Sequence, residues 1–438
     1  MVKKLLETEK LSEKENPEVD LAKRRSLTTI GKAGVTACAA LKAPYVFSRS
    51  KTRLRVLGTH VTLQEELRQR AMSDLGIELV FEPKGSAAVL QKASVSPASF
   101  DLYEQWSNSI NVLWHSGSIQ AIDTRRITNW NEINNLTKTG KLTAEANLGA
   151  GDAPYKILHV QNDNKLGPGK SDFVSFLPYV HNVDSFGYNT NVIDKGIEYE
   201  TESWSWLLDE RYAGKVAIVN APTIGLFDLA LAAQSKGMIR FDDIGDMSKQ
   251  ELDDLFKILI NLKKQGHFSG FWTSVPESVD FMASNRVVIE SMFSPAVSAL
   301  NGQDIPVTYA APKEGYRGWH GVMCLSSMTQ GREKDAAYEY MNWWLSGWPG
   351  AFIARQGYYI SNPQRSKQYL SDDEWNYWYQ GKPTSKDLTG TDGKISVREN
   401  EIRRGGSYEK RFSNVSVWNT VMPRYEYTLQ KWYEFISA

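Results

Sequence analysis

Residues 53–81, RLRVLGTHVTLQEELRQRAMSDLGIELVF, decide the fold of this chain. A strand pattern ends at Gly58, an amphipathic helix pattern over 63–75 ends at Gly76, and a second strand pattern follows. This β-α-β order predicts a parallel sheet with a crossover helix, and ligands of such sheets lie beyond the carboxyl ends of the strands. The loops 58–62 and 104–109 are therefore candidate walls of a pocket.

The same alternation continues along the chain and predicts an α/β protein. Further strand patterns lie at 216–219 and 286–290, and further helix patterns at 223–233, 249–264 and 334–345. Two glycine-containing polar stretches, 134–169 and 381–406, are typical of surface insertions. A chain of 438 residues is too long for one ordinary core, so we expect two lobes.

Composition excludes several classes of function. The 51 basic and 51 acidic side chains leave no net charge to attract a nucleic acid. The sequence contains no nucleophile elbow, zinc-protease motif, Walker loop or dinucleotide fingerprint, and the six histidines show no metal-ligand spacing. We therefore expect no cofactor, no metal and no catalysis. An exported enzyme without a recognisable motif, and a large non-catalytic adhesin or carbohydrate-binding protein, remain as alternatives.

The N-terminus has the pattern of an export signal. Arg24 and Arg25 precede a weakly apolar run over 28–43, which is too short and too polar to cross a membrane. Residues 1–50 are therefore interpreted as a twin-arginine-type signal, which predicts a periplasmic protein. A surface helix with a chance arginine pair and a lipoprotein cleavage box ending at Cys38 are the alternatives.

Several segments, in order, resemble the periplasmic spermidine/putrescine receptor family of ABC importers. They are FDL at 100–102, GSIQAID at 117–123, LPY at 177–179, FGYN at 186–189, SW at 203–204, YAGK at 212–215, and PKEG at 312–315 followed by Trp319. The resemblance implies an α/β, two-lobed binding protein in which each lobe is a mixed sheet flanked by helices and crossing hinge strands join the lobes. It also implies a small-molecule ligand between the lobes, delivery to a membrane permease with a cytoplasmic ATPase, and a monomer.

On this resemblance the chain divides into five segments. The signal covers 1–50, lobe 1 begins with 51–183, lobe 2 begins with 184–318, the return segment of lobe 1 is 319–370, and a C-terminal helical segment, 371–438, completes lobe 2.

The sequence departs from the family where acids would hold a polyamine. After the strand at 216–219 it has Asn220-Ala221-Pro222, and two residues past Trp319 it has Gly321. Each buried ammonium group requires a carboxylate close by, so we reject spermidine and putrescine as ligands.

The aligned pocket positions are instead mostly aromatic and neutral. They are Trp106, Ser107, Asn108, Tyr179, His181, Asp184, Asn220, Thr223, Phe293, Trp319 and His320. Aromatic rings attract an onium group without a countercharge, which favours a zwitterion such as glycine betaine or dimethylsulfoniopropionate. A sugar or oligosaccharide, or another ligand of the polyamine family, is the alternative. It is also open whether Trp106, Phe293 and Trp319 merely pack the lobe interface.

Two pairs of adjacent aromatic residues lie late in the chain. Tyr358 and Tyr359 could be compared with the adjacent tyrosines of ferric-iron receptors, but no acidic or histidine partner motif lies nearby. Trp343 and Trp344 lie in a helix whose register predicts one buried and one exposed ring.

Overall fold

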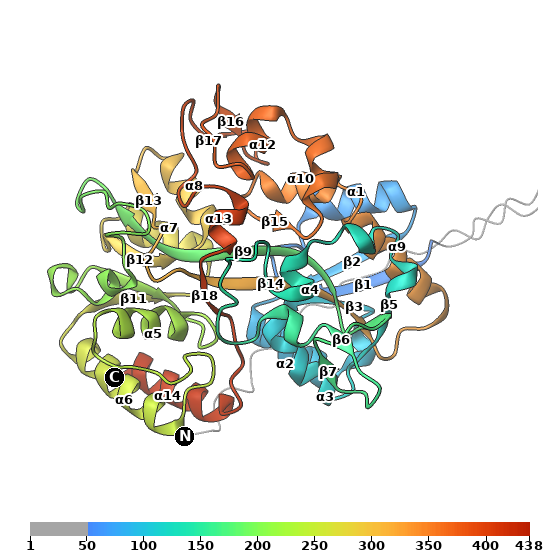
Figure 1. The fold of residues 1–438 in the computed structure, drawn as a ribbon, viewed down its shortest axis with the longest axis horizontal. Helices are drawn as coiled ribbons and strands as arrows, with labels where there is room; N and C mark the ends of the chain where they lie inside the picture. Colours follow the sequence, from blue (N-terminus) through green and yellow to red (C-terminus); the bar gives the residue numbers. More distant parts are fainter. Residues whose placement is uncertain (1–50) are drawn as a thin grey trace, which may run out of the picture. The chain divides into compact units, whose positions relative to one another are not determined.

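The computed structural model describes residues 51–438, in which twelve strands form one mixed sheet (Figure 1). Its central order is β11-β10-β12-β9-β14-β3-β1-β2. These strands are β1 (Arg53–Gly58), β2 (Glu78–Pro83), β3 (Leu102–Trp106), β9 (Leu177–Asn189), β10 (Val216–Val219), β11 (Phe268–Trp272), β12 (Ile289–Met292) and β14 (Tyr316–Ser326). The predicted α/β class is confirmed.

The two longest strands join two halves of the sheet. β9 pairs antiparallel with β12 over 185–188 and with β14 over 177–184, so one strand serves both halves. β14 in turn pairs antiparallel with β3. Two lobes joined by crossing strands, as the sequence predicts, are therefore present. The predicted boundaries at 183/184 and 318/319 fall inside these two strands, and the division into five segments stays a prediction.

Lobe 1 is built on the parallel strands β1, β2 and β3. Helix α1 (Glu65–Leu75) connects β1 to β2, and α2 (Ser86–Val95) connects β2 back to β3. Because these two right-handed connections run in opposite directions along the sheet, their helices cover opposite faces. α1 buries Leu67 and Ala71 and ends at Gly76, whose φ of 67° is the left-handed conformation that glycine adopts without strain. α9 (Gly331–Trp344) packs on α1.

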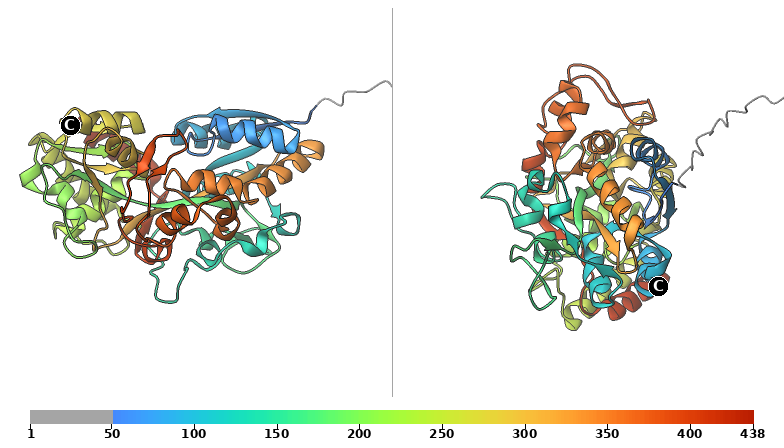
Figure 2. Two further views of the ribbon diagram at one scale, coloured as in Figure 1. Left: turned by 90° about the horizontal axis from the view of Figure 1, so that it is seen from above. Right: turned by 90° about the vertical axis from the view of Figure 1, so that its right-hand side faces the viewer.

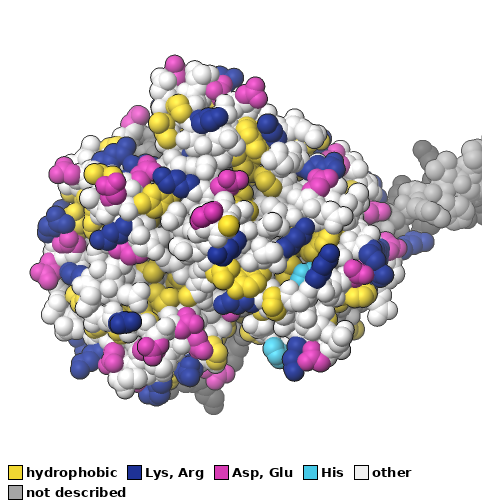
Figure 3. All heavy atoms as spheres, in the orientation of Figure 1, with side chains coloured by type: hydrophobic (Ala, Val, Ile, Leu, Met, Phe, Trp, Pro, Cys, Tyr) yellow, Lys and Arg dark blue, Asp and Glu magenta, His cyan; other side chains and the backbone are white. Residues whose placement is uncertain are grey.

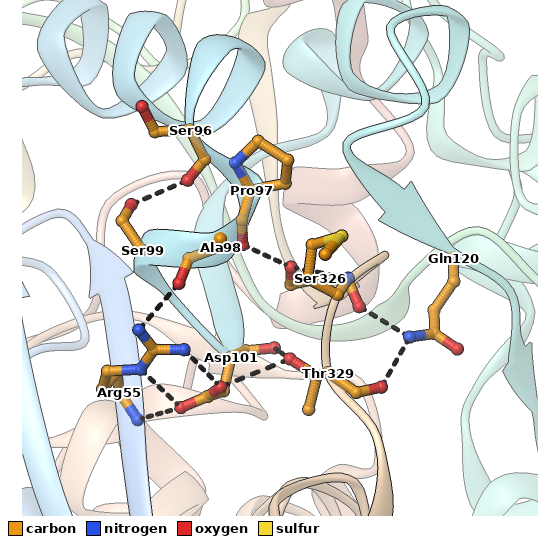
Figure 4. Close-up of polar contacts among 10 residues, drawn as sticks. Arg55, Ser96, Pro97, Ala98, Ser99, Asp101, Gln120, Ser326 and Thr329 are labelled. Atoms are coloured by element: carbon orange, nitrogen blue, oxygen red, sulfur yellow. Dashed lines mark hydrogen bonds and ion pairs between the residues drawn. The ribbon is translucent and has the colours of Figure 1, made fainter.

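A polar network ties β1 to the start of β3 and the end of β14 (Figure 4). The Arg55 guanidinium donates to both carboxylate oxygens of Asp101 and to the Ala98 carbonyl, each at 2.8–3.0 Å. The hydrogen bond to Asp101 raises the pKa of Arg55. The amide of Gln120 donates to the carbonyls of Ser326 and Thr329. The network fixes the rear of lobe 1, away from the carboxyl ends of its strands.

Lobe 2 is the other half of the sheet, drawn green and yellow at the opposite end from β1 and β2 (Figure 2). Its two faces carry separate cores. The helices of one face are α5 (Gly225–Ser235), α6 (Lys249–Lys264) and α14 (Tyr425–Ser437), and those of the other are α7 (Val275–Ala283) and α8 (Ser294–Asn301). A capping box between Ser248 and Glu251 begins α6.

The C-terminal segment covers one face of the crossing strands. It contains α12 (Asp372–Trp378), the hairpin of β16 (Leu388–Thr389) and β17 (Ile395–Val397), α13 (Tyr408–Phe412) and β18 (Val415–Trp418). β18 pairs parallel with β14, and Trp375, Tyr408, Phe412 and Trp418 share a core with residues of both crossing strands. The segment thus holds strands as well as helices.

The register expected for Trp343 and Trp344 is wrong. Trp343 is 5% exposed and Trp344 is fully buried. The reason is that α9 is covered twice: Trp343 donates to Asp74 of α1 and packs on Trp348, while Trp344 meets Tyr179 of β9. A helix between two layers has no exposed face along this stretch.

Acidic and basic side chains are interspersed on the face drawn in Figure 3, as the zero net charge leads one to expect. Among residues 51–438, no helix combines the length and hydropathy that a membrane crossing requires. The predicted export signal and Cys38 lie outside the described residues, and Cys324 is a buried free thiol.

Candidate ligand-binding cleft

A small cavity lies where the two lobes meet the crossing strands. Its lining residues are Val61, Trp106, Asp184, Ile224, Phe293, Trp319, Tyr358 and Asn419. In lobe 1, Val61 follows β1 and Trp106 ends β3. In lobe 2, Ile224 and Phe293 directly precede α5 and α8, so both lobes contribute. The cavity of about 30 Å³ has room for one or two water molecules.

Strand register explains which side chains share the cleft face. Trp319 lies directly opposite Asn182, and Arg317 opposite Asp184. Directly opposed residues of an antiparallel pair point to the same face, and so do alternate residues along one strand. The face therefore carries Trp319 and Arg317 from β14 together with Asn182 and Asp184 from β9.

Aromatic rings form one wall of the cavity. The ring centroids of Trp106 and Trp319 are 4.8 Å apart at 60°, and those of Trp319 and Tyr358 are 5.5 Å apart at 73°. On the lobe 2 side, Phe293 packs edge-on against Trp272 at 4.9 Å. In each of these pairs the edge of one ring meets the face of the other.

A buried charge cluster forms the floor. Arg317 is fully buried, with its Nε 2.6 Å from Asp228 and its Nη1 3.6 Å from Asp184. Nη1 also donates to Asn419 at 2.9 Å. Burial lowers the pKa of Arg317, but the charges of Asp228 and Asp184 more than offset this and the net direction is upward. One guanidinium group is therefore shared by two carboxylates.

Asp184 is the carboxylate that reaches the cavity. Its Oδ1 accepts a hydrogen bond from Tyr309 at 3.2 Å. Burial raises the pKa of Asp184 from the ordinary 3.8 to about 6, although the charge of Arg317 opposes this shift. Because Asp228 lies closer to Arg317, the charge that Asp184 carries at neutral pH is the less compensated of the two.

Three of the sequence-predicted site residues lie away from the cavity. His181 and His320 are directly opposed and stack at 4.7 Å on the other face of the crossing strands. His181 contacts the Tyr408 hydroxyl at 2.7 Å, and burial lowers the pKa of both rings, to about 4 at His320. Tyr179 packs in lobe 1, where its hydroxyl lies 3.0 Å from both Thr62 and Glu104.

The remaining predicted residues do not line the cavity. Asn220 accepts a hydrogen bond from the Trp432 indole at 2.9 Å and is thereby held to the C-terminal helix. Thr223 is half-buried just before α5. Ser107 and Asn108 are buried in a short turn after Trp106, and the Asn108 Oδ1 has no hydrogen-bond partner within residues 51–438. Their role in binding stays a prediction.

Sequence reasoning missed three lining residues of the cavity, Ile224, Tyr358 and Asn419, and placed Val61 only within the predicted wall 58–62. It also missed Asn182, which the strand register places on the cleft face. Asn182 is fully buried, and neither its Oδ1 nor its Nδ2 has a partner in the described part of the chain. Its position two residues before Asp184 in a strand was the available signal.

The tyrosine pair does not converge on one point. Tyr358 contacts Trp319 at the cavity, whereas Tyr359 lies among His181, Tyr379 and Tyr408. Within residues 51–438, no three His, Cys, Asp or Glu side chains meet at a possible metal position.

Residues 69–380, more than half of the chain, match the family model of bacterial extracellular solute-binding proteins. The chain belongs to this family. Its members bind solutes and are not enzymes, so the alternative of an exported enzyme falls away. No curated protein sequence matches the chain significantly.

Solved structures share the fold at low identity. The spermidine/putrescine ABC transporter substrate-binding protein PotD of Streptococcus pneumoniae aligns with a TM-score of 0.58 and 16% identity, over 88% of this chain and all of that chain. The TpPotD lipoprotein of Treponema pallidum aligns with a TM-score of 0.60 and 13% identity, over 88% and 100%. The binding protein AgtB of A. tumefaciens, solved with agropinic acid, gives 0.54 and 11%, over 88% and 99%.

The raised pKa of Asp184 predicts a pH-dependent stability. A carboxyl group whose pKa is higher in the folded state stabilises that state fully below its ordinary pKa, and the stabilisation is lost as the pH rises through about 6. Asp184→Asn removes this loss. Its free energy of unfolding, relative to the wild type, should therefore increase by about 2 kcal/mol between pH 4.5 and 7.5, in urea titrations without ligand.

Asp163→Asn is the matched control, because Asp163 is exposed and a hydrogen bond from Lys165 lowers its pKa below this range. Its difference from the wild type should not change with pH. A flat difference for Asp184→Asn as well would contradict a buried, titrating carboxylate at the floor of the cleft.

Proposed function

We propose that this protein is the extracytoplasmic receptor of an ABC importer, acting as a monomer. It captures a small solute between its lobes and presents the closed form to a membrane permease with a cytoplasmic ATPase. The family membership and the crossing strands support this proposal, because both lobes contribute walls to one cleft. A solute that contacts both lobes stabilises the closed state by its differential affinity.

The ligand that fits the cleft best is a small onium zwitterion, of the glycine betaine or dimethylsulfoniopropionate type. The observation that carries this proposal is the group of aromatic rings, Trp106, Trp319, Tyr358 and Phe293, around the single carboxylate of Asp184. Cation–π attraction to desolvated rings contributes about 2 kcal/mol or more. Asp184, with its incompletely compensated charge, adds a Coulombic term for the same cation.

The cleft offers too few carboxylates for a polyamine. Asp184 is the one acid among the lining residues, and Asp228 is already bound to Arg317. A ligand with several ammonium groups would bury at least one of them without a counterion, at a cost of several kcal/mol.

Unpartnered polar atoms support a carboxylate on the same ligand. The Nδ2 of Asn182 and the Nε1 of Trp106 are buried donors without a hydrogen-bond acceptor among residues 51–438. A buried donor that stays unpaired costs about 1–3 kcal/mol. A ligand carboxylate that accepts from both would remove that cost, so these two groups are the expected carboxylate contacts.

The size of the cavity requires the lobes to separate before a solute enters. About 30 Å³ is too small for a trimethylammonium group, so the contacts of Ile224 and Phe293 with the lobe 1 wall must open. β9 and β14 are the segments that connect the lobes and are the expected hinges.

The first prediction from the proposed function concerns the ligand. Glycine betaine or dimethylsulfoniopropionate should raise the melting temperature more than spermidine, amino acids or oligosaccharides, because a ligand that binds only the native state stabilises it by mass action. A thermal-shift panel at pH 7.5 measures this. The largest shift with spermidine would overturn the argument from the carboxylates, and the largest shift with an oligosaccharide would favour stacking on the tryptophans instead.

The second prediction concerns the aromatic wall. Trp106→Ala and Trp319→Ala should each weaken binding of the best solute from the panel by about 1–3 kcal/mol in calorimetric titrations, because cation–π attraction and contact area are lost. The control is Trp204→Ala, a fully buried tryptophan of lobe 2. It should cost about 3–5 kcal/mol of folding stability and leave affinity unchanged in the folded fraction.

Truncation of Trp106 or Trp319 that destabilises the unliganded protein as much as Trp204→Ala, with affinity preserved, would mean that the rings only pack the lobe interface.

The third prediction concerns export to the periplasm. Residues 1–50 fused to a folded reporter should direct it across the inner membrane, and exchanging Arg24 and Arg25 together for Lys should retain it in the cytoplasm. Exchanging Lys3 and Lys4 together for Gln is the control and should not change export. Export that survives the arginine exchange would point to another signal, and membrane attachment abolished by Cys38→Ser would point to a lipoprotein.

A further inference from the structure

A second and larger cavity lies on the opposite side of the crossing strands from the solute cleft. It has a volume of about 580 Å³ and lies, partly open, between the C-terminal segment and the elements α8 and β13 (Val307–Tyr309) of lobe 2. Five of its lining side chains are cationic, namely Lys195, Arg398, Arg403, Arg404 and Arg411, and two are acidic, namely Asp304 and Glu401. The cavity is therefore basic in a protein that has no net charge.

Two of these arginines are buried without a carboxylate partner. Arg403 is 6% exposed and Arg411 is 1% exposed. Neither forms an ion pair with any residue of 51–438, whereas Arg404 is neutralised by Glu198 at 3.0 Å and Glu202 at 2.5 Å. Arg398 lies 3.7 Å from Asp387. Lys195 likewise forms no ion pair within residues 51–438, and neither do the lining acids Asp304 and Glu401. Arg403 and Arg411 are thus the buried cations of the cavity that no carboxylate contacts.

The contacts of these two arginines use only part of their hydrogen-bonding capacity. Arg403 donates to the Gly357 carbonyl at 2.8 Å and, at 3.5 Å, to that of Trp378. Arg411 donates to the carbonyls of Arg404 and Val183, and its buried Nε has no partner among the described residues. A guanidinium group has five N–H donors, so most of the ten are left without a protein acceptor.

The aromatic surroundings stabilise these cations only in part. The Arg403 guanidinium lies 4.8 Å from the Tyr359 ring centroid and 4.6 Å from that of Trp378. Burial, together with the nearby charge of Arg411, lowers the pKa of Arg403. An uncompensated buried charge costs several kcal/mol, and an anion in the cavity would relieve this cost for both arginines.

We propose that this cavity is a second binding site, which takes a small oxyanion, a carboxylate or a phosphate, between Arg403, Arg411 and Arg398. Planar guanidinium groups bind both kinds of anion through paired hydrogen bonds. The aromatic rings of Tyr377 and Trp378 and the volume of the cavity leave room for the organic part of such a ligand. The site is independent of which solute the cleft holds, and it rests on residues of the C-terminal segment.

The two sites meet at one side chain. Tyr309 lines the basic cavity, and its hydroxyl donates to Asp184 at the floor of the cleft. Arg411 contacts the carbonyl of Val183, the residue that precedes Asp184. An anion bound here would therefore lie directly behind the strand that carries the cleft carboxylate.

Calorimetric titration of the unliganded protein with citrate and with inorganic phosphate, at constant ionic strength kept by sodium chloride, tests the proposal. At least one of the two anions should bind saturably. Arg403→Gln should weaken that binding by on the order of ten-fold or more, the usual loss for a hydrogen bond to a charged group. Arg398→Gln should weaken it as well, and because Arg398 is exposed this variant will fold even if Arg403→Gln does not.

Arg125→Gln is the matched control, since Arg125 is exposed, is paired with Asp123 in lobe 1 and does not line the cavity. It should bind the anion as the wild type does. Binding of citrate identifies an organic carboxylate site, and binding of phosphate alone identifies a phosphate site. The absence of saturable binding of either anion, or equal binding by the wild type and both cavity variants, would overturn the proposal.

Discussion

The pairing of β9 with β14 is the constraint on which the rest of the structure depends. Every residue of both strands is buried, although they carry two histidines, two asparagines, an aspartate and an arginine. Their backbone groups are satisfied by each other and by strands of both lobes, but their polar side chains must find partners on the two faces. The cleft and the C-terminal segment are the two solutions, one on each face.

The two faces solve the burial of polar groups in different ways. On the cleft face opposite charges are paired, because Arg317 lies between Asp228 and Asp184. On the other face the histidines are neutral and stacked among tyrosine rings, so that no buried charge remains there, although His181 Nδ1 and His320 Nε2 have no hydrogen-bond partner among residues 51–438. The incomplete compensation that remains, at Asp184 on one side and at Arg403 and Arg411 on the other, marks where we propose ligands of opposite charge.

The architecture could be predicted from the sequence because its signals are local. The β-α-β pattern at 53–81 and the strand at 216–219 lie within two residues of their positions in the structure. The faces of the crossing strands could not be predicted in the same way. His181, Asn182 and Asp184 are equally polar, and only the partners across the sheet decide which of them reaches the cleft. The prediction for Trp343 was wrong for a related reason, since part of its cover comes from Asp74 of α1, which is far away in the sequence.

The opposite chemistry of the two faces limits how a lineage of such receptors can diverge. Gain or loss of a single residue within β9 or β14 would exchange the faces, and histidines would replace the aspartate and tryptophan of the cleft. The cleft residues that β9 and β14 carry can therefore change only by substitution at fixed strand length. Changes in length are confined to segments outside the crossing strands, such as 381–406, which already contributes Arg398 and Arg403. A segment outside the crossing strands is therefore a place where a new function can evolve while the old one is kept.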